Sequence, residues 1–115
     1  MAYRVEAAKS VETQLEELYL RVSERAPQQG AAWFNGLEQA ILSLDRHPKR
    51  CAIAPESFDP DHPVRVLYDG RAPHVYRVFF AIDEAARIVR VLHVRYGARQ
   101  RATPGEIVPE QIPTR

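Results

Sequence analysis

The sequence VYRVFFAIDEAARIVRVLHV, residues 75–94, contains two runs rich in β-branched and aromatic residues on either side of a short polar segment. Such runs are typical of strands, and we expect one at Val75 to Ile82 and another at Ile88 to Val94. The four residues between them, DEAA at 83–86, are typical of a hairpin loop. The stretch therefore predicts two neighbouring antiparallel strands.

The region that precedes these strands is expected to be helical. From Lys9 onward apolar residues recur with helical spacing, and the pattern resumes after Pro27, from about Gln28. The first stripe comprises Val11, Leu15, Leu18, Tyr19 and Val22, and the second comprises Trp33, Leu37, Ala40, Ile41 and Leu44. Because only a short link separates the two helices, they should form an antiparallel hairpin.

Two further segments complete the expected order. Residues 2–7, AYRVEA, alternate apolar and polar side chains and predict a short strand before the helices. Residues 64–68 predict another strand, which follows an acidic connection that contains four prolines, at 48, 55, 60 and 63. The predicted fold class is therefore α+β with the order β-α-α-β-β-β, an antiparallel sheet covered on one face by the helical hairpin.

Length and composition indicate one ordinary globular domain. The chain has 115 residues, of which 45% are hydrophobic and 27% are charged, enough for one modest core. We expect this domain to span residues 1–102 and a proline-rich tail to occupy 103–115. Since the sequence has neither a membrane-spanning apolar run nor a secretion signal, we expect a cytoplasmic protein with no membrane partner.

Positive charge is concentrated in the second half of the chain. Residues 1–62 contain seven Lys or Arg and ten Asp or Glu, whereas residues 63–115 contain nine and five. Only Lys9 and Lys49 are lysines, and the planar guanidinium group of arginine pairs bidentately with phosphate. The second half is therefore either a polyanion-binding region or the product of a general preference for arginine.

The predicted strands bring several of these cations to one face of the sheet. If Val78 and Phe80 face the core, Arg77 faces away from it, because side chains alternate along a strand. The other residues expected near Arg77 are Arg65, Phe79, His93 and Arg99. Together they would form a shallow basic concavity that attracts a phosphodiester, with the Phe79 ring available to stack on an unpaired base.

Each residue of this set also has an ordinary structural interpretation. Arg77 is equally compatible with a solvated arginine on the sheet, and Arg65 with an ion pair to Asp69. His93 lies between apolar neighbours and suits the edge of the core, while Tyr96 suits either packing or stacking on a base. There is no Gly-rich phosphate loop, no Cys–His pair with an orienting group and no metal-ligand spacing, so we expect no metal and no cofactor.

Taken in series, several segments resemble the RelE/ParE family, the toxins of bacterial type II toxin–antitoxin systems. The resemblance covers residues 2 to about 101 and rests on the element order and on four segments. These are AILSLDRHPKRCAIAPE (40–56), VRVLYDG (64–70), VYRVFFAID (75–83) and VRVLHVRYGAR (89–99). The resemblance implies a small toxin that a cognate antitoxin neutralises.

The resemblance implies one of two activities, of which we expect the first, the RelE-like ribosome-dependent mRNA endonuclease, with the second as the alternative. RelE-like members cleave messenger RNA in the ribosomal A site without a metal ion, through attack by the ribose 2′-hydroxyl, so their partners are the ribosome and mRNA. ParE-like members have the same fold but inhibit DNA gyrase and catalyse no reaction themselves. A degenerate toxin that only binds its antitoxin is a third interpretation.

Residue by residue, the resemblance to RelE-like nucleases gives the phosphate-binding role to Arg65, Arg77 and Arg99. Arg77 matches the arginine of the family's YR strand, Arg99 matches the arginine after its last strand, and Arg65 lies where these nucleases usually have lysine. The catalytic tyrosine expected shortly after Arg99 is missing, because residues 100–106 read QRATPGE. His93 and Tyr96 are the candidate substitutes for this acid or base.

Overall fold

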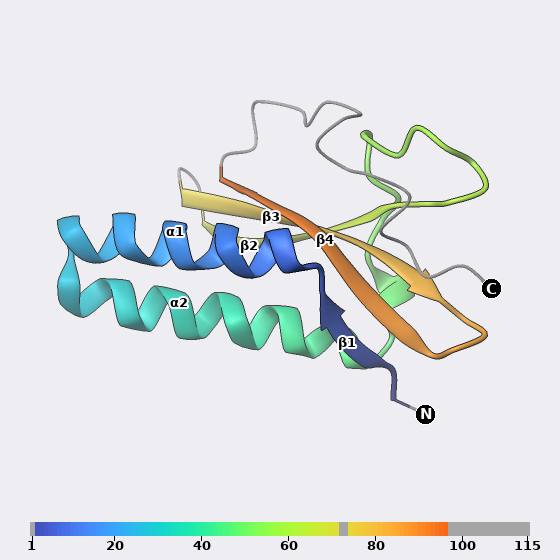
Figure 1. Cartoon of the computed structure of the whole chain (residues 1–115), viewed down its shortest axis with the longest axis horizontal. Coiled ribbons are helices and arrows are strands. Elements are labelled where there is room, and N and C mark those ends of the chain that lie inside the picture. Colours follow the sequence, from blue (N-terminus) through green and yellow to red (C-terminus); the bar gives the residue numbers. More distant parts are fainter. Residues whose placement is uncertain (1, 72–73, 97–115) are drawn as a thin grey trace.

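The computed structural model of the chain describes residues 2–71 and 74–96. These residues form the predicted α+β fold, and the helices and strands follow one another in the predicted order (Figure 1). The elements are β1 (Arg4–Ala7), α1 (Lys9–Arg25), α2 (Pro27–Leu42), β2 (Arg65–Arg71), β3 (His74–Asp83) and β4 (Ile88–Tyr96), with short 3₁₀ helices η1 (Ser43–Asp45) and η2 (Pro48–Arg50) after α2. No helix in this described part is long and apolar enough to cross a membrane. The proposed tail at 103–115 lies outside the described residues.

The strands form one sheet in the order β1-β4-β3-β2. As predicted, β2, β3 and β4 form an antiparallel meander. β1 lies beside β4 but runs parallel to it, with Arg4 opposite Ile88 and Ala7 opposite Val91. The sheet is therefore mixed rather than wholly antiparallel, because the helical hairpin separates β1 from the meander and no tight turn fixes its direction.

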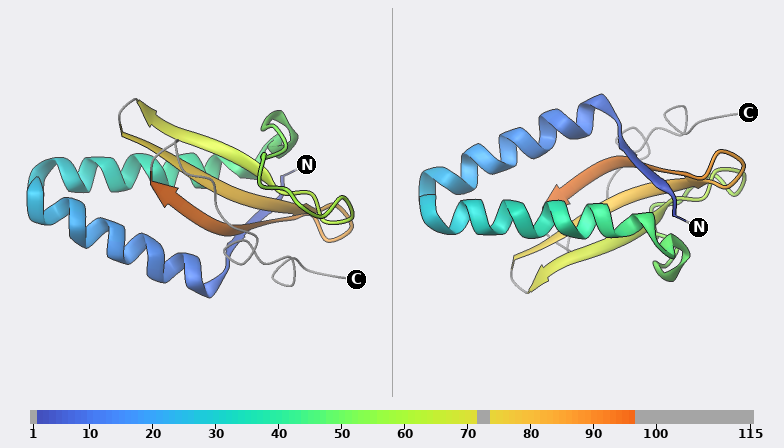
Figure 2. Two further views of the ribbon diagram at one scale, coloured as in Figure 1. Left: turned by 90° about the horizontal axis from the view of Figure 1, so that it is seen from above. Right: turned by 90° about the horizontal axis from the view of Figure 1, so that it is seen from below.

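The two helices form the predicted antiparallel hairpin and lie on one face of the sheet (Figure 2). α2 begins at Pro27, so this proline is the first residue of the helix rather than part of a linker. Proline suits this position because the first-turn backbone N–H that it lacks would have no partner within the helix. Ala26 alone joins the helices, with its N–H donating to the carbonyl of Val22 at 2.9 Å and its carbonyl accepting from Gly30 at 2.7 Å.

The main core lies between this helical hairpin and the sheet. Val78 and Phe80 of β3 are fully buried there, as predicted, against Val11 of α1 and Leu37 of α2. Burial of a side chain such as Phe80 contributes about 1.5–3 kcal/mol to the free energy of unfolding. The helical stripes and the alternation along β3 therefore form one continuous apolar layer.

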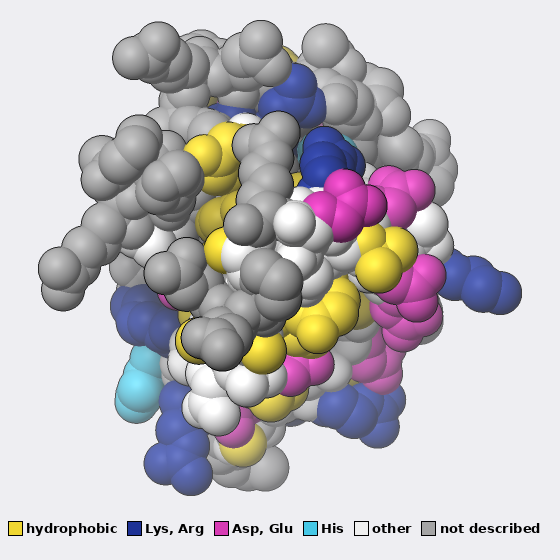
Figure 3. All heavy atoms as spheres, turned by 90° about the vertical axis from the view of Figure 1, so that its left-hand side faces the viewer, with side chains coloured by type: hydrophobic (Ala, Val, Ile, Leu, Met, Phe, Trp, Pro, Cys, Tyr) yellow, Lys and Arg dark blue, Asp and Glu magenta, His cyan; other side chains and the backbone are white. Residues whose placement is uncertain are grey.

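A chain of aromatic rings extends this layer toward the α1–α2 connection. Trp33 contacts Phe34 and Tyr76, with ring centroids 6.0 Å and 4.9 Å away, and Phe34 in turn contacts Tyr19 at 5.0 Å. Tyr76 also contacts Tyr96 at 4.9 Å. Viewed from this end, hydrophobic side chains reach the surface of the molecule (Figure 3). Apolar side chains of the described residues therefore form part of the surface at this end.

The opposite face of the sheet carries a second apolar cluster. Phe79 of β3 and Leu92 of β4 are buried there with Ala54 and Val64, which belong to the connection between η2 and β2. This connection is held to the sheet by its backbone, because Ala54 donates to the carbonyl of Val64 at 2.8 Å and Val66 donates to that of Ala52 at 3.1 Å. The expectation that this face is open is therefore wrong where the connection covers it.

Two glycines of α2 provide a matched test of helix packing. A Cβ atom added at Gly30 would lie 2.9 Å from the Oγ and 3.1 Å from the Cα of Ser23, whereas nothing lies within 4 Å of the equivalent position at Gly36. Alanine is favoured over glycine within a helix by about 1 kcal/mol, so Gly36→Ala should raise the free energy of unfolding by about this amount. Gly30→Ala should lower it by about 1–3 kcal/mol, because the helices must move apart. Urea unfolding measures both changes, and equal effects would contradict the close contact.

Candidate functional site

Three residues of the predicted site lie together on the sheet face that is away from the helices. In the register of β3 and β4, Arg77 lies opposite Arg95 and Phe79 lies opposite His93. The Cζ atom of Arg77 is 5.4 Å from the centroid of the Phe79 ring, which is 6.0 Å from that of His93. A β-bulge follows, since Phe80 lies opposite Val91. The predicted grouping of Arg77, Phe79 and His93 is therefore confirmed.

Arg65 and Tyr96 lie on the other face, where the helices pack. Arg65 is opposite Phe80 and Tyr96 is opposite Tyr76, and both of these partners belong to the main core. Side chains of directly opposed residues point to the same side of a sheet. The expectation that Arg65 and Tyr96 share a site with Arg77 is therefore wrong, because the register assigns them to the opposite face.

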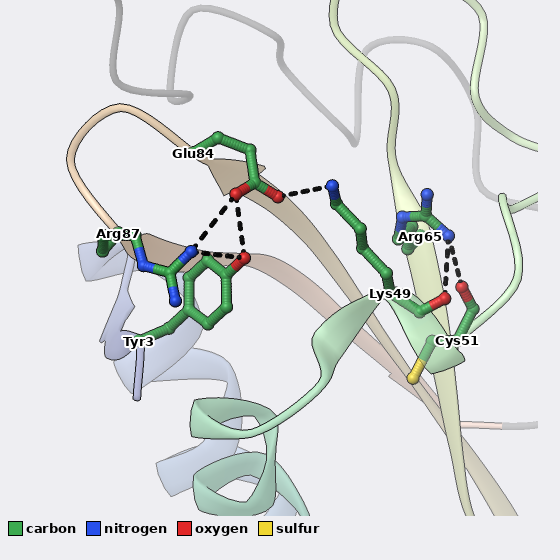
Figure 4. Close-up of polar contacts among 6 residues, drawn as sticks. All are labelled: Tyr3, Lys49, Cys51, Arg65, Glu84 and Arg87. Carbon is green, nitrogen blue, oxygen red and sulfur yellow. Dashed lines mark hydrogen bonds and ion pairs between the residues drawn. The ribbon is translucent and has the colours of Figure 1, made fainter. Parts of the chain in front are cut away.

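Arg65 connects β2 to the segment around η2. Its Nη1 atom donates hydrogen bonds to the carbonyl oxygens of Cys51 at 2.6 Å and of Lys49 at 3.4 Å (Figure 4). Both of these backbone oxygens come from the region where the chain leaves η2. The Arg65 guanidinium therefore binds the backbone carbonyls of this segment, and the alternative of an ion pair with Asp69 is not observed.

Arg77 forms a buried ion pair with Glu56 of the connection. The Nη1 atom of Arg77 lies 2.7 Å from the Oε2 atom of Glu56, and the two side chains are 5% and 0% exposed. The prediction of an accessible Arg77 is therefore wrong. A buried charge is costly without an opposite charge, so the arginine side chain that points away from the helices needs this carboxylate.

Glu56 is the residue of this site that the sequence did not single out. It precedes Asp59 and Asp61 in the acidic connection, and its neighbours in the sequence do not distinguish it from a solvent-exposed acidic residue. Asp59 instead accepts hydrogen bonds from the backbone of Asp61 and pairs with His62, both at 2.9 Å. Only the fold of the connection over the sheet distinguishes Glu56 from these neighbours.

His93 is held by a side chain from α1. The backbone N–H of Val94 donates to Oε1 of Gln14 at 3.0 Å, which orients the amide so that its Nε2 donates to Nδ1 of His93 at 2.9 Å. Because Nδ1 accepts a hydrogen bond, the neutral ring carries its proton on Nε2. His93 is 8% exposed and Phe79 is fully buried, so the expectation that Phe79 stacks on a base does not fit this arrangement.

The third arginine of the predicted set, Arg99, lies outside the described residues. Within residues 2–71 and 74–96 there is no group of three or more His, Cys, Asp or Glu side chains that could hold a metal ion. The described part of the site therefore consists of a neutralised arginine, a buried phenylalanine and an oriented histidine, with Arg95 beside them.

Comparisons with known proteins identify the family. The family model described as the ParE toxin of the type II toxin–antitoxin system, parDE, matches residues 5–101. No curated protein matches the sequence. Similar solved structures include a free-state variant of the E. coli toxin RelE, with a TM-score of 0.53 and 17% identity over 82% of each chain. The archaeal RelE–RelB complex from Pyrococcus horikoshii OT3 has a TM-score of 0.50 and 18% identity, over 87% of this chain and 100% of that chain. At these identities the two structures establish a common fold.

The Arg77–Glu56 pair yields a stability prediction. Arg77→Met leaves the Glu56 carboxylate buried without this partner, and Glu56→Leu does the same to the guanidinium. Each single change should lower the free energy of unfolding by about 3–5 kcal/mol. The double variant Glu56→Leu/Arg77→Met removes both charges and should recover most of this loss. Guanidinium chloride unfolding measures the four proteins, and additive losses in the double variant would contradict a mutually dependent pair.

Proposed function

The chain belongs to the ParE toxin family of type II toxin–antitoxin systems, and we propose that it inhibits DNA gyrase by binding, as ParE-like toxins do. The observation that carries this proposal is the ion pair between Arg77 and Glu56, 2.7 Å apart and almost completely buried. It commits the central arginine of the expected nuclease site to a structural partner. A toxin that acts by binding needs no such arginine at its surface.

The requirements of RNA cleavage support the same choice. A metal-free nuclease has to hold one phosphate with several cations and to supply an acid and a base beside it. In this chain Arg65 lies on the opposite face from Arg77 and donates to backbone carbonyls. Residues 100–106, where a catalytic tyrosine would be expected, contain no tyrosine. These features favour a binding activity over catalysis.

A ribosome-dependent mRNA endonuclease is the second candidate function. Its support is the position of Arg95 opposite Arg77 and of His93 opposite Phe79, which gathers two cations and an imidazole on one face. In this candidate Arg77 would exchange Glu56 for the scissile phosphate, Arg99 would also bind it, and His93 would transfer a proton through Nε2. The partners would then be the ribosome and mRNA.

A cognate antitoxin is the partner common to both candidates. The family model describes toxins of toxin–antitoxin pairs, and one similar structure is a RelE–RelB complex. Both targets, gyrase and the ribosome, are inside the cell, so we place the toxin in the cytoplasm. A toxin that has lost its activity would keep the antitoxin contact and nothing else.

Induced expression in growing cells tests the proposed function. We expect double-strand DNA breaks with intact messenger RNA, and we expect the purified chain to inhibit supercoiling by gyrase. Messages cut inside ribosome-bound codons, without DNA breaks, would establish the nuclease instead. Unaffected growth would indicate the degenerate toxin.

The double variant Glu56→Leu/Arg77→Met separates the two candidates. Because it lacks the arginine but keeps a packed interior, it should retain toxicity when Arg77 only supports the fold. A nuclease that depends on Arg77 would lose its toxicity, with an expected rate loss of about a hundredfold or more. Growth curves after induction measure this difference, and the cellular level of folded protein, measured in parallel, is the control.

A further inference from the structure

A second basic region lies where the residues just before β1, the η1–η2 segment and the β3–β4 loop meet. These segments line a pocket of about 640 Å³, and its principal side chains are Tyr3, Arg46, His47, Lys49, Arg50 and Arg87. Four of the six are arginine or lysine, and no acidic residue lines the pocket. We call this the basic pocket; it shares no residue with the Arg77–Glu56 pair.

The backbone of the basic pocket is unusual at two positions. His47 has a φ of 48° and Arg87 a φ of 57°, and these are the only non-glycine residues with positive φ in the described part of the chain. An L-residue in this region costs free energy that glycine would avoid. Both residues line the same pocket, and such strain is typically concentrated where a side chain has a function.

Along one edge of the basic pocket, but outside its lining, the Glu84 carboxylate contacts three of the pocket's side chains. The carboxylate of Glu84 accepts hydrogen bonds from Lys49 Nζ at 2.8 Å and from the Tyr3 hydroxyl at 2.9 Å, and it lies 3.6 Å from Nη1 of Arg87 (Figure 4). Two hydrogen bonds lower the pKa of the Glu84 carboxyl below its ordinary value: the one from Lys49 has the larger effect and the one from Tyr3 the next largest. The surroundings of this edge therefore stabilise negative charge.

On the other edge of the basic pocket the side chain of Arg50 fixes the backbone, and the side chain of Arg46 is exposed. Arg50 donates from Nη1 to the carbonyls of Arg46 at 2.7 Å and of His47 at 3.2 Å, and from Nη2 to Oγ of Ser43 at 3.0 Å. These bonds fix the segment that carries Arg46. The Arg46 side chain itself is exposed and makes no hydrogen bond or ion pair with the described residues. It is therefore available to a ligand without breaking an existing contact.

We propose that the basic pocket binds a phosphate group carried by a nucleotide or a nucleic acid. Three of its four cations are arginines, whose planar forks match the oxygens of phosphate. The Arg87 guanidinium is stacked on the Tyr3 ring, 4.1 Å from its centroid, which restricts its orientation before any ligand arrives. Pre-organised cations lose less entropy when they bind. This proposal does not depend on whether the toxin acts on gyrase or on the ribosome.

Titration of the ¹⁵N-labelled full chain tests the site. Inorganic phosphate should shift the amide signals of residues 46, 47, 49, 50 and 87 and leave that of Gly36 in α2 unchanged. ATP and a fluorescently labelled DNA duplex then distinguish the two sources of phosphate. Comparable affinity for ATP and duplex would indicate a nucleotide ligand. Much tighter, strongly salt-dependent binding of the duplex would indicate nucleic acid.

Two arginine variants give the matched comparison. Arg46→Gln should weaken binding about tenfold or more, the usual effect of losing a hydrogen bond between charged groups. For a DNA duplex it should also reduce the slope of log K against log salt by about 0.9. Arg21→Gln removes another exposed arginine, on α1, which makes no hydrogen bond or ion pair with the described residues, and should leave binding unchanged. Within the described part of the chain neither arginine has a hydrogen bond or ion pair to lose, so both variants should melt close to the temperature of the wild type.

A His47→Gly variant should change thermal stability and phosphate binding in opposite directions. It should melt at a higher temperature, because the backbone strain is relieved, and bind phosphate more weakly, because the imidazole is lost. Absence of phosphate-induced shifts at residues 46, 47, 49, 50 and 87 would overturn the proposal. Equal weakening by Arg46→Gln and Arg21→Gln would overturn it as well, since binding would then reflect only the overall charge of the chain.

Discussion

The strand β3 is buried on both of its faces, and this constraint organises the rest of the structure. Its residues from Tyr76 to Ala81 are all buried. On one side Val78 and Phe80 pack under the helical hairpin, and on the other Phe79 and Ala81 pack under the connection that precedes β2. A charged residue in such a strand requires an internal partner, and Glu56 on that connection supplies it for Arg77. The connection that covers β3 therefore also supplies the carboxylate that pairs with Arg77.

The elements of this fold could be predicted from sequence because their signals are local. Helical periodicity located α1 and α2, and alternation along β3 correctly assigned Val78 and Phe80 to the core. Which residues share the site depends instead on how segments that are distant in the sequence pack against one another. The register of β2 against β3 decides that Arg65 lies opposite Phe80, and a shift of one residue would have reversed its side. The role of Glu56 depends on where an irregular, proline-rich connection folds, which no periodic pattern encodes.

The two basic regions of the molecule differ in how their charge is compensated. At Arg77 a buried carboxylate neutralises the cation, and the neighbouring imidazole of His93 is oriented by Gln14. Beside the basic pocket one exposed carboxylate, Glu84, pairs with Lys49, and Arg46 of the pocket lining has no internal partner among the described residues. The first arrangement stabilises the fold, whereas the second leaves charge available to a ligand. A toxin that works by binding agrees with the burial of Arg77, and the exposed Arg46 belongs to a pocket that does not include Arg77.

The exchange rate of the guanidinium protons of Arg77, measured by NMR on the arginine side chains of the full chain, reports whether its ion pair with Glu56 is buried in solution. An arginine held in a buried ion pair should exchange these protons slowly with solvent, and Arg21, which is exposed on α1, serves as the internal reference. We expect Arg77 to exchange far more slowly than Arg21, and Glu56→Leu to remove this protection. Exchange at Arg77 as fast as at Arg21 would show that the arginine is accessible, and would contradict the structural role given to it here.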